Sequence, residues 1–187
     1  MLIKTINKSY HEEYKSFQSR FIGYLYPTKS ISEFKDYLTQ LKKEHSKATH
    51  IGYAYRIGFQ NEGVRANDDG EPSGTAGKPI LNQLYSFQLQ NISLFVIRYY
   101  GGTKLGVAGL IEAYKEAANL CLNQAEIFEM EEEKEMELFL DPEKYYEVIK
   151  LLKYNNINIL DSSYKEDKYV LKILIPTSKM EWLEKIV

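Results

Sequence analysis

The feature that most constrains the fold of this 187-residue chain is a change in charge and hydrophobic pattern near residue 129. Residues 1–128 carry 15 Lys and Arg against 12 Asp and Glu, whereas residues 129–187 carry 9 against 14, giving net charges of +3 and −5. The acidic run at residues 129–133 lies where a helical pattern ends and an alternating pattern begins. The sequence therefore predicts two units, residues 1–128 and 133–187, joined by a solvated linker.

The composition narrows the class of protein. With 44% hydrophobic and 27% charged residues, the chain is typical of a folded globular protein. Its overall net charge of −2 excludes attraction of the whole molecule to nucleic acid, so any such contact must be local. A single cysteine, Cys121, excludes an internal disulfide and the usual zinc sites. Because no long apolar run or leader pattern occurs, we expect a cytoplasmic protein without membrane contact. The three histidines do not have metal-binding spacing, so we expect no metal, and we expect no cofactor.

The first unit alternates between strand-like and helix-like segments. Residues 19–26, 50–59 and 92–98 are rich in aromatic and β-branched residues and predict strands, whereas the polar, glycine-rich residues 60–77 predict a loop. Helices are expected after a Ser30 cap, from Lys78-Pro79 to about residue 87, and from residue 110 onward. Cys121 lies on the apolar face of the last of these helices, where we expect an inert core thiol.

The second unit has clear local signals. An alternating strand at residues 136–140 is followed by Asp141 as N-cap and Pro142 at the first helical position. A hairpin of residues 157–163 and 169–175 precedes a last helix, for which Ser178 and Glu181 form a capping box. The order β-α-β-β-α is a split β-α-β sandwich without its last strand, which leaves one sheet edge open.

Residues 68–79 form the first candidate site. They resemble a phosphate-binding P-loop only superficially, because Pro72 and Pro79 stand where that motif needs Gly and Ser or Thr. The glycines before the helix, together with Lys78, still suit an anion. The nearby acidic cluster either fixes the loop, by pairing with basic side chains or backbone N–H groups, or holds a cation or acts as acid and base; we favour the first. This cluster consists of Asp68, Asp69 and Glu71.

Residues 99–109 form the second candidate site, and their glycines do not match a dinucleotide fingerprint. These glycines either permit left-handed turns and close packing, or let the backbone approach a ligand. In the second case Arg98 and Lys104 would supply charge, and Tyr99 and Tyr100 would supply stacking faces. His50, at the start of a strand, is more typical of an ordinary half-buried histidine than of a site residue.

Taken together, residues 68–81 and 96–106 resemble the signature of the IMPACT/YigZ family, and the resemblance covers nearly the whole chain. It implies an α+β protein with an N-terminal domain similar to domain 2 of ribosomal protein S5. The C-terminal domain would be ferredoxin-like and similar to domain V of elongation factor G, here without its last strand. The family has no agreed catalytic residue. The shared signature residues are Asp68, Asp69, Gly70, Glu71, Pro72, Gly74, Thr75, Gly77, Lys78, Arg98, Tyr99, Tyr100, Gly101, Gly102, Lys104, Leu105 and Gly106.

The resemblance implies a non-enzymatic regulator linked to translation, whose signature surface binds RNA or a ribosome-associated protein. Two alternatives stay open: a regulator that contacts only proteins, and an enzyme acting on a phosphorylated small molecule. In the leading hypothesis the residues that contact the ligand are Lys78, Arg98, Tyr99, Tyr100 and Lys104. The residues that position the loops are Asp68, Asp69, Glu71, Thr75, Gly101, Gly102 and Gly106.

Overall fold

A computed structural model, which describes residues 1–60 and 62–187, shows an α+β chain divided into two compact units. One unit comprises residues 3–130, and the other comprises residues 131–187 together with Met1 and Leu2. The elements from the N-terminus to residue 131 are β1 (Leu2–Thr5), β2 (Tyr10–Ser16), β3 (Ser19–Pro27), α1 (Ile31–Glu44), β4 (His50–Ile57), β5 (Gly63–Asn67), α2 (Gly77–Ser86), β6 (Ile92–Tyr99), α3 (Gly106–Gln124) and β7 (Phe128–Glu131).

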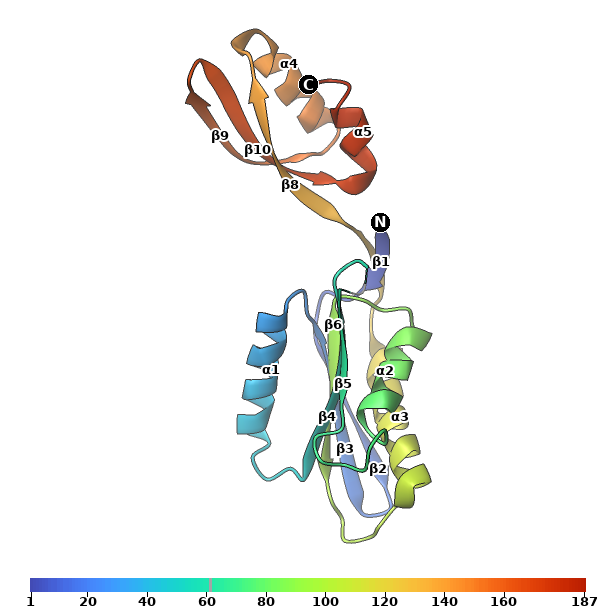
Figure 1. Ribbon diagram of the computed structural model, residues 1–187. Helices are drawn as coiled ribbons and strands as arrows, with labels where there is room; N and C mark the ends of the chain where they lie inside the picture. The colour runs from blue at the N-terminus through green and yellow to red at the C-terminus, as the bar shows by residue number, and fades with distance from the viewer. Residues whose placement is uncertain (61) are drawn as a thin grey trace. The chain divides into compact units, whose positions relative to one another are not determined.

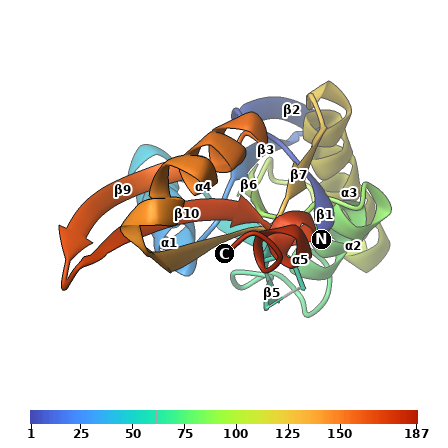
Figure 2. The same ribbon diagram turned by 90° about the horizontal axis from the view of Figure 1, so that it is seen from above.

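The first unit is built on a five-stranded sheet in the order β2-β3-β6-β4-β5, with every neighbouring pair antiparallel. Helix α1 covers one face, and α2 and α3 cover the other, as Figures 1 and 2 show. The central strand β6 is buried on both faces, which explains its continuous apolar sequence. Phe95 and Ile97 pack toward α1, whereas Leu94 and Val96 pack toward α2 and α3.

A local signal accounts for the start of α1, and close packing fixes α3 on the sheet. The Ser30 side chain accepts a hydrogen bond from the Glu33 N–H at 3.2 Å, which confirms the predicted N-cap of α1. Helix α3 packs so closely on β3 that a Cβ on Gly23 would lie 2.7 Å from Cys121 Sγ. The predicted burial of Cys121 is confirmed.

Two predictions in this part of the chain are wrong, and two further strands were not predicted. Strand β5 lies within residues 60–77, which were expected to form a loop; residue 61 of that stretch is outside the described residues. The expected linker at residues 129–133 instead holds the end of β7, which pairs with β1, and the start of β8. Residues 1–18, to which the sequence assigned no element, contain β1 and β2. Such strands are partly exposed, so their pattern lacks the apolar run that identifies a buried strand.

The second unit contains β8 (Glu133–Leu140), α4 (Pro142–Tyr154), β9 (Asn158–Lys165), β10 (Lys168–Pro176), the 3-10 turn η1 (Thr177–Lys179) and α5 (Met180–Leu183). Its order confirms the predicted β-α-β-β-α sequence, and its strands form an antiparallel sheet in the order β8-β10-β9. The predicted capping box is wrong, because α5 begins after Lys179 and has no side-chain cap. Among the described residues no fourth strand joins this sheet.

Neither unit contributes a helix, within residues 1–60 and 62–187, that is long and apolar enough to cross a membrane.

Candidate functional site

A cleft of about 430 Å³ lies in the first unit where β4, β6 and the start of α3 meet the loop after β5. Both candidate segments contribute to it: Glu71 and Pro72 come from the first, and Arg98, Tyr100 and Lys104 come from the second. The other lining residues are Thr49, His50, Leu105, Gly106, Val107 and Leu110. The fold therefore brings two stretches that are distant in sequence to one cleft.

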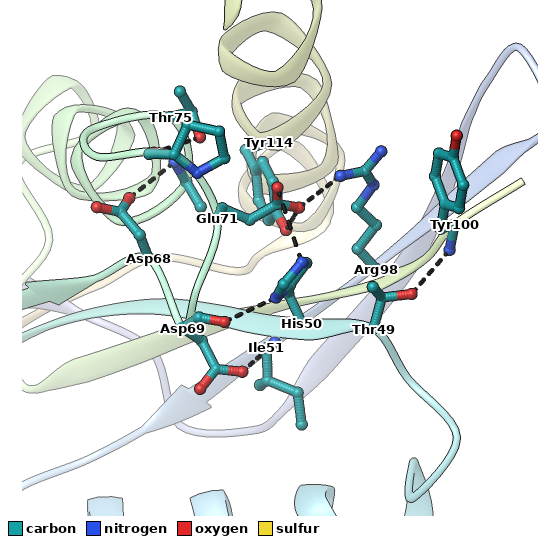
Figure 3. A network of polar contacts seen from close by, with 12 residues as sticks. Thr49, His50, Ile51, Asp68, Asp69, Glu71, Thr75, Arg98, Tyr100 and Tyr114 are labelled. Atoms are coloured by element: carbon teal, nitrogen blue, oxygen red, sulfur yellow. Dashed lines mark hydrogen bonds and ion pairs between the residues drawn. The ribbon is translucent and has the colours of Figure 1, made fainter. Parts of the chain in front are cut away.

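A buried polar network holds this region together (Figure 3). Arg98 Nη1 donates to Glu71 Oε1 at 2.7 Å, and the exposed fractions of the two side chains are 7% and 3%. The Tyr114 hydroxyl donates to the same oxygen at 2.9 Å. Burial, together with the Glu71 carboxylate, raises the pKa of Tyr114 far above its usual range, so the hydroxyl remains a donor. The network joins the loop after β5, the central strand and α3.

Arg98 retains hydrogen-bonding capacity that this network does not use. Its Nε is buried without a partner, and no partner for its Nη2 occurs among the described residues. The guanidinium carbon lies 5.3 Å from the centre of the Tyr100 ring, within the range of a cation–π contact. Tyr100 is 45% exposed and its N–H donates to Thr49 Oγ1 at 3.1 Å. A cation and an accessible aromatic ring thus lie together in the cleft.

The tautomer of His50 follows from its contacts. Its Nδ1 lies 2.7 Å from the carbonyl oxygen of Asp69, and a carbonyl can only accept, so Nδ1 carries the hydrogen. Its Nε2 faces the Glu71 carboxylate at 4.0 Å, too long for a hydrogen bond. The loop after β5 therefore engages Nδ1 of His50, and Nε2 lies on the side of Glu71.

The N-terminus of α3 is open. Its N-cap residue, Leu105, offers no side-chain hydrogen bond, and the first turn contains no acidic residue. Gly106 begins the helix with a φ of +70°, a conformation that favours glycine. The N–H groups of residues 106–108 have no acceptor among the described residues, so the positive end of the helix dipole is not neutralised. Exposed Lys104 lies next to this end of the helix.

The start of α2 differs, because an internal carboxylate already occupies it. Asp68 accepts hydrogen bonds from the N–H groups of Gly74, Ala76 and Gly77 at 2.8, 2.9 and 2.8 Å. Burial alone would raise the pKa of Asp68, but these three N–H groups outweigh it and lower the pKa. The prediction of an anion site before α2 is therefore wrong: Asp68 is the anion.

Two further contacts fix the loop between β5 and α2. Asp69 Oδ2 accepts from the Ile51 N–H at 2.7 Å, which attaches the loop to β4. The Thr75 hydroxyl donates to the Pro72 carbonyl at 2.7 Å and closes a turn just before α2. Both contacts are internal, so these side chains set the position of the loop that carries Glu71.

Lys78 and Tyr99 do not line the cleft. Lys78 is exposed and lines a separate hollow with Lys115. Side chains alternate across a strand, so Arg98 faces the cleft while Tyr99 faces α1, where its hydroxyl lies 2.9 Å from His45 Nδ1.

The glycines of the second segment have different roles. A Cβ on Gly101 would collide with the backbone of Gln18 and Ser19, so this glycine serves close packing. Gly102 has a φ of +90° and nothing nearby for a Cβ to meet, and it lies outside the cleft lining. Of these glycines only Gly106 lies in the cleft. Within the described residues no group of three or more His, Cys, Asp or Glu could hold a metal ion.

Comparison with known proteins identifies the family. A model of the Impact N-terminal domain matches residues 17–122, which include every residue that lines the cleft. The chain belongs to the IMPACT family.

Two relatives and one solved structure extend this finding. IMPACT family member YvyE of Bacillus subtilis (strain 168) is 32% identical over 178 residues, covering 95% of this chain and 76% of YvyE. IMPACT family member YigZ of Escherichia coli (strain K12) is 39% identical over 109 residues, covering 57% of this chain and 53% of YigZ. The crystal structure of a hypothetical protein matches with a TM-score of 0.79 and 28% identity, covering 98% of this chain and 90% of that one.

Some residues of the cleft, and of the buried network beside it, were given no functional role from the sequence of this IMPACT chain. His50 was interpreted as an ordinary histidine, although it pairs directly with Arg98 across β4 and β6. Tyr114 was assigned only to a helix face; a buried tyrosine hydroxyl needs a partner, which was a signal for a nearby acceptor such as Glu71. Val107 and Leu110 share the face of α3 that carries Tyr114, at helical spacings of three and four residues, and could have been found on that basis.

Proposed function

We propose that this chain is a translation-linked regulator that binds single-stranded RNA through the cleft of its first unit. The translation link rests on the IMPACT family, and the choice of RNA rests on one juxtaposition. Exposed Lys104, the uncapped start of α3 and the accessible ring of Tyr100 all border the same cleft. Cations and helix N-termini bind phosphate, and aromatic rings stack on bases.

The charged and aromatic groups of the cleft have distinct roles in this proposal. Lys104 and the N–H groups at the start of α3 contact phosphate, and Tyr100 stacks on a base. Arg98, held by Glu71, supports the Tyr100 ring from one side. Residues 1–128 carry a net +3 and residues 129–187 a net −5, which supports a contact confined to the first unit.

The domain assignments belong to the same proposal. Residues 1–128 would be an S5 domain 2-like domain, as the family resemblance implies. Residues 133–187 would be a ferredoxin-like domain without its fourth strand. The order β8-α4-β9-β10-α5 and the sheet order β8-β10-β9 support the second assignment.

A salt titration with a matched pair of variants tests RNA binding. Fluorescence anisotropy would follow a labelled single-stranded RNA as it binds wild type, Lys104→Ala and Lys78→Ala. Removing Lys104 should weaken binding and reduce the slope of log K against log salt by about 0.7, the contribution of one phosphate on a single strand. Lys78→Ala removes the same charge away from the cleft and should bind like wild type. Equal losses in the two variants would refute the cleft as the RNA site.

A protein partner is the second candidate, favoured by one observation. Val107, at the cleft wall, is 59% exposed beside Leu105 and Leu110. An apolar contact through these side chains would change little with salt, whereas RNA binding should weaken steeply. The same titration therefore separates the two candidates once a bound partner is in hand.

A further inference from the structure

We infer that the cleft takes a terminal phosphate, that is, a phosphomonoester carried on a nucleoside, in preference to the internal phosphodiesters of an RNA strand. The nucleoside monophosphate could be the 5′ end of an RNA or a free nucleotide. This inference deepens the proposed function and rests on the same cleft.

The first argument is the balance of charge. Arg98 and Glu71 neutralise each other in the floor of the cleft. Lys104 and the positive end of α3 remain, and together they supply about 1.5 positive charges, taking the helix end as about half a charge. A phosphomonoester carries about −1.5 to −2 at pH 7, whereas a phosphodiester carries about −1. The monoester matches the cleft more closely.

The second argument is the supply of unused donors. The N–H groups of residues 106–108 have no acceptor within the described part of the chain. Arg98 also lines the cleft, and no partner for its Nη2 occurs among the described residues. A terminal phosphate offers three oxygens free of ester bonds, one more than a diester does. It can therefore accept from more of these donors at once.

His50 also lines the cleft. Its Nδ1 is engaged with the Asp69 carbonyl, and its Nε2 lies 4.0 Å from the Glu71 carboxylate, which is paired with Arg98. The ring therefore borders the ligand space, while both of its nitrogens lie against groups of the protein.

The size and lining of the cleft suit the rest of such a ligand. Its volume of about 430 Å³ falls within the range of small-molecule pockets. Tyr100 offers a ring for a base, and Leu105 and Val107 offer apolar surface for the nucleoside.

The experiment compares matched ligands on the wild-type chain, so it does not depend on any variant folding. Two RNAs of about 12 nucleotides, identical in sequence and labelled at the 3′ end, carry either a 5′-phosphate or a 5′-hydroxyl. Adenosine 5′-monophosphate and adenosine form the second matched pair, measured by thermal shift. We expect the 5′-phosphate to tighten RNA binding at least about tenfold, and only the nucleotide of the second pair to raise Tm.

Variants then test whether the preference for the 5′-phosphate depends on residues of the cleft. Lys104→Ala should remove the preference for the 5′-phosphate, and Lys78→Ala should keep it.

The outcomes separate this inference from the proposed function. Equal binding of the two RNAs, with binding lost in Lys104→Ala, would overturn the inference and leave RNA binding intact. A response to the mononucleotide alone would uphold the inference for a free nucleotide and overturn RNA binding. Binding of no probe would overturn both.

Discussion

Replacing Glu71 with Gln tests whether the buried ion pair holds the cleft together. The side chain keeps its shape and an oxygen that can accept from Arg98 and Tyr114, but the countercharge of Arg98 is lost. At an effective dielectric constant of about 20, unit charges 2.7 Å apart attract by about 6 kcal/mol. The retained hydrogen bonds and relaxation reduce the expected loss in free energy of unfolding to about 3 kcal/mol.

The exposed ion pair of Arg20 and Glu13, in the same unit, provides a matched control for the buried pair. Arg20 Nη2 and Glu13 Oε2 are also 2.7 Å apart, but the exposed fractions of these side chains are 51% and 31%. Glu13→Gln should therefore cost far less than Glu71→Gln, because water replaces the lost partner. Urea unfolding followed by far-UV circular dichroism measures both. The fluorescence of Trp182 reports the second unit, and its transition should not move. A loss for Glu71→Gln no larger than that for Glu13→Gln would refute the reasoning.

Two other predictions use the titrating groups of the first unit. The folded-state pKa of Asp68 is lowered below its ordinary 3.8, so its stabilising contribution is present above that pH and is lost as pH falls through the folded value. Asp68→Asn should lower the free energy of unfolding by about 1–2 kcal/mol at pH 7. The difference in urea midpoint between this variant and wild type should shrink below pH 4, and a constant difference would contradict the prediction. Burial raises the pKa of Cys121 to about 12, so the native thiol should not react with a disulfide reagent at pH 8. The thiol of the urea-unfolded chain should react. Rapid labelling of the native protein would disprove the burial of Cys121.

The elements that could be predicted are those whose cause is local. Ser30 caps α1 through its own side chain, and Pro142 begins α4 because the first turn needs no N–H from it. The apolar run of β6 predicts a central strand on its own. Strands β2 and β5 carry no such signal. Each pairs along the five-stranded sheet with only one neighbour, β3 or β4, and its polar side chains reach solvent.

The two glycine-bearing segments and the family signature they form could be identified from the sequence alone. So could the chemical types of the residues available to contact a ligand. Only the tertiary structure decided which of them meet. The antiparallel register of β4 and β6 places His50 opposite Arg98, and strand alternation turns Tyr99 to the other face. The carboxylate of Asp68 takes the helix start that Lys78 was expected to share with a ligand. Register and hydrogen-bond partners join residues far apart in the chain, so no local pattern specifies them.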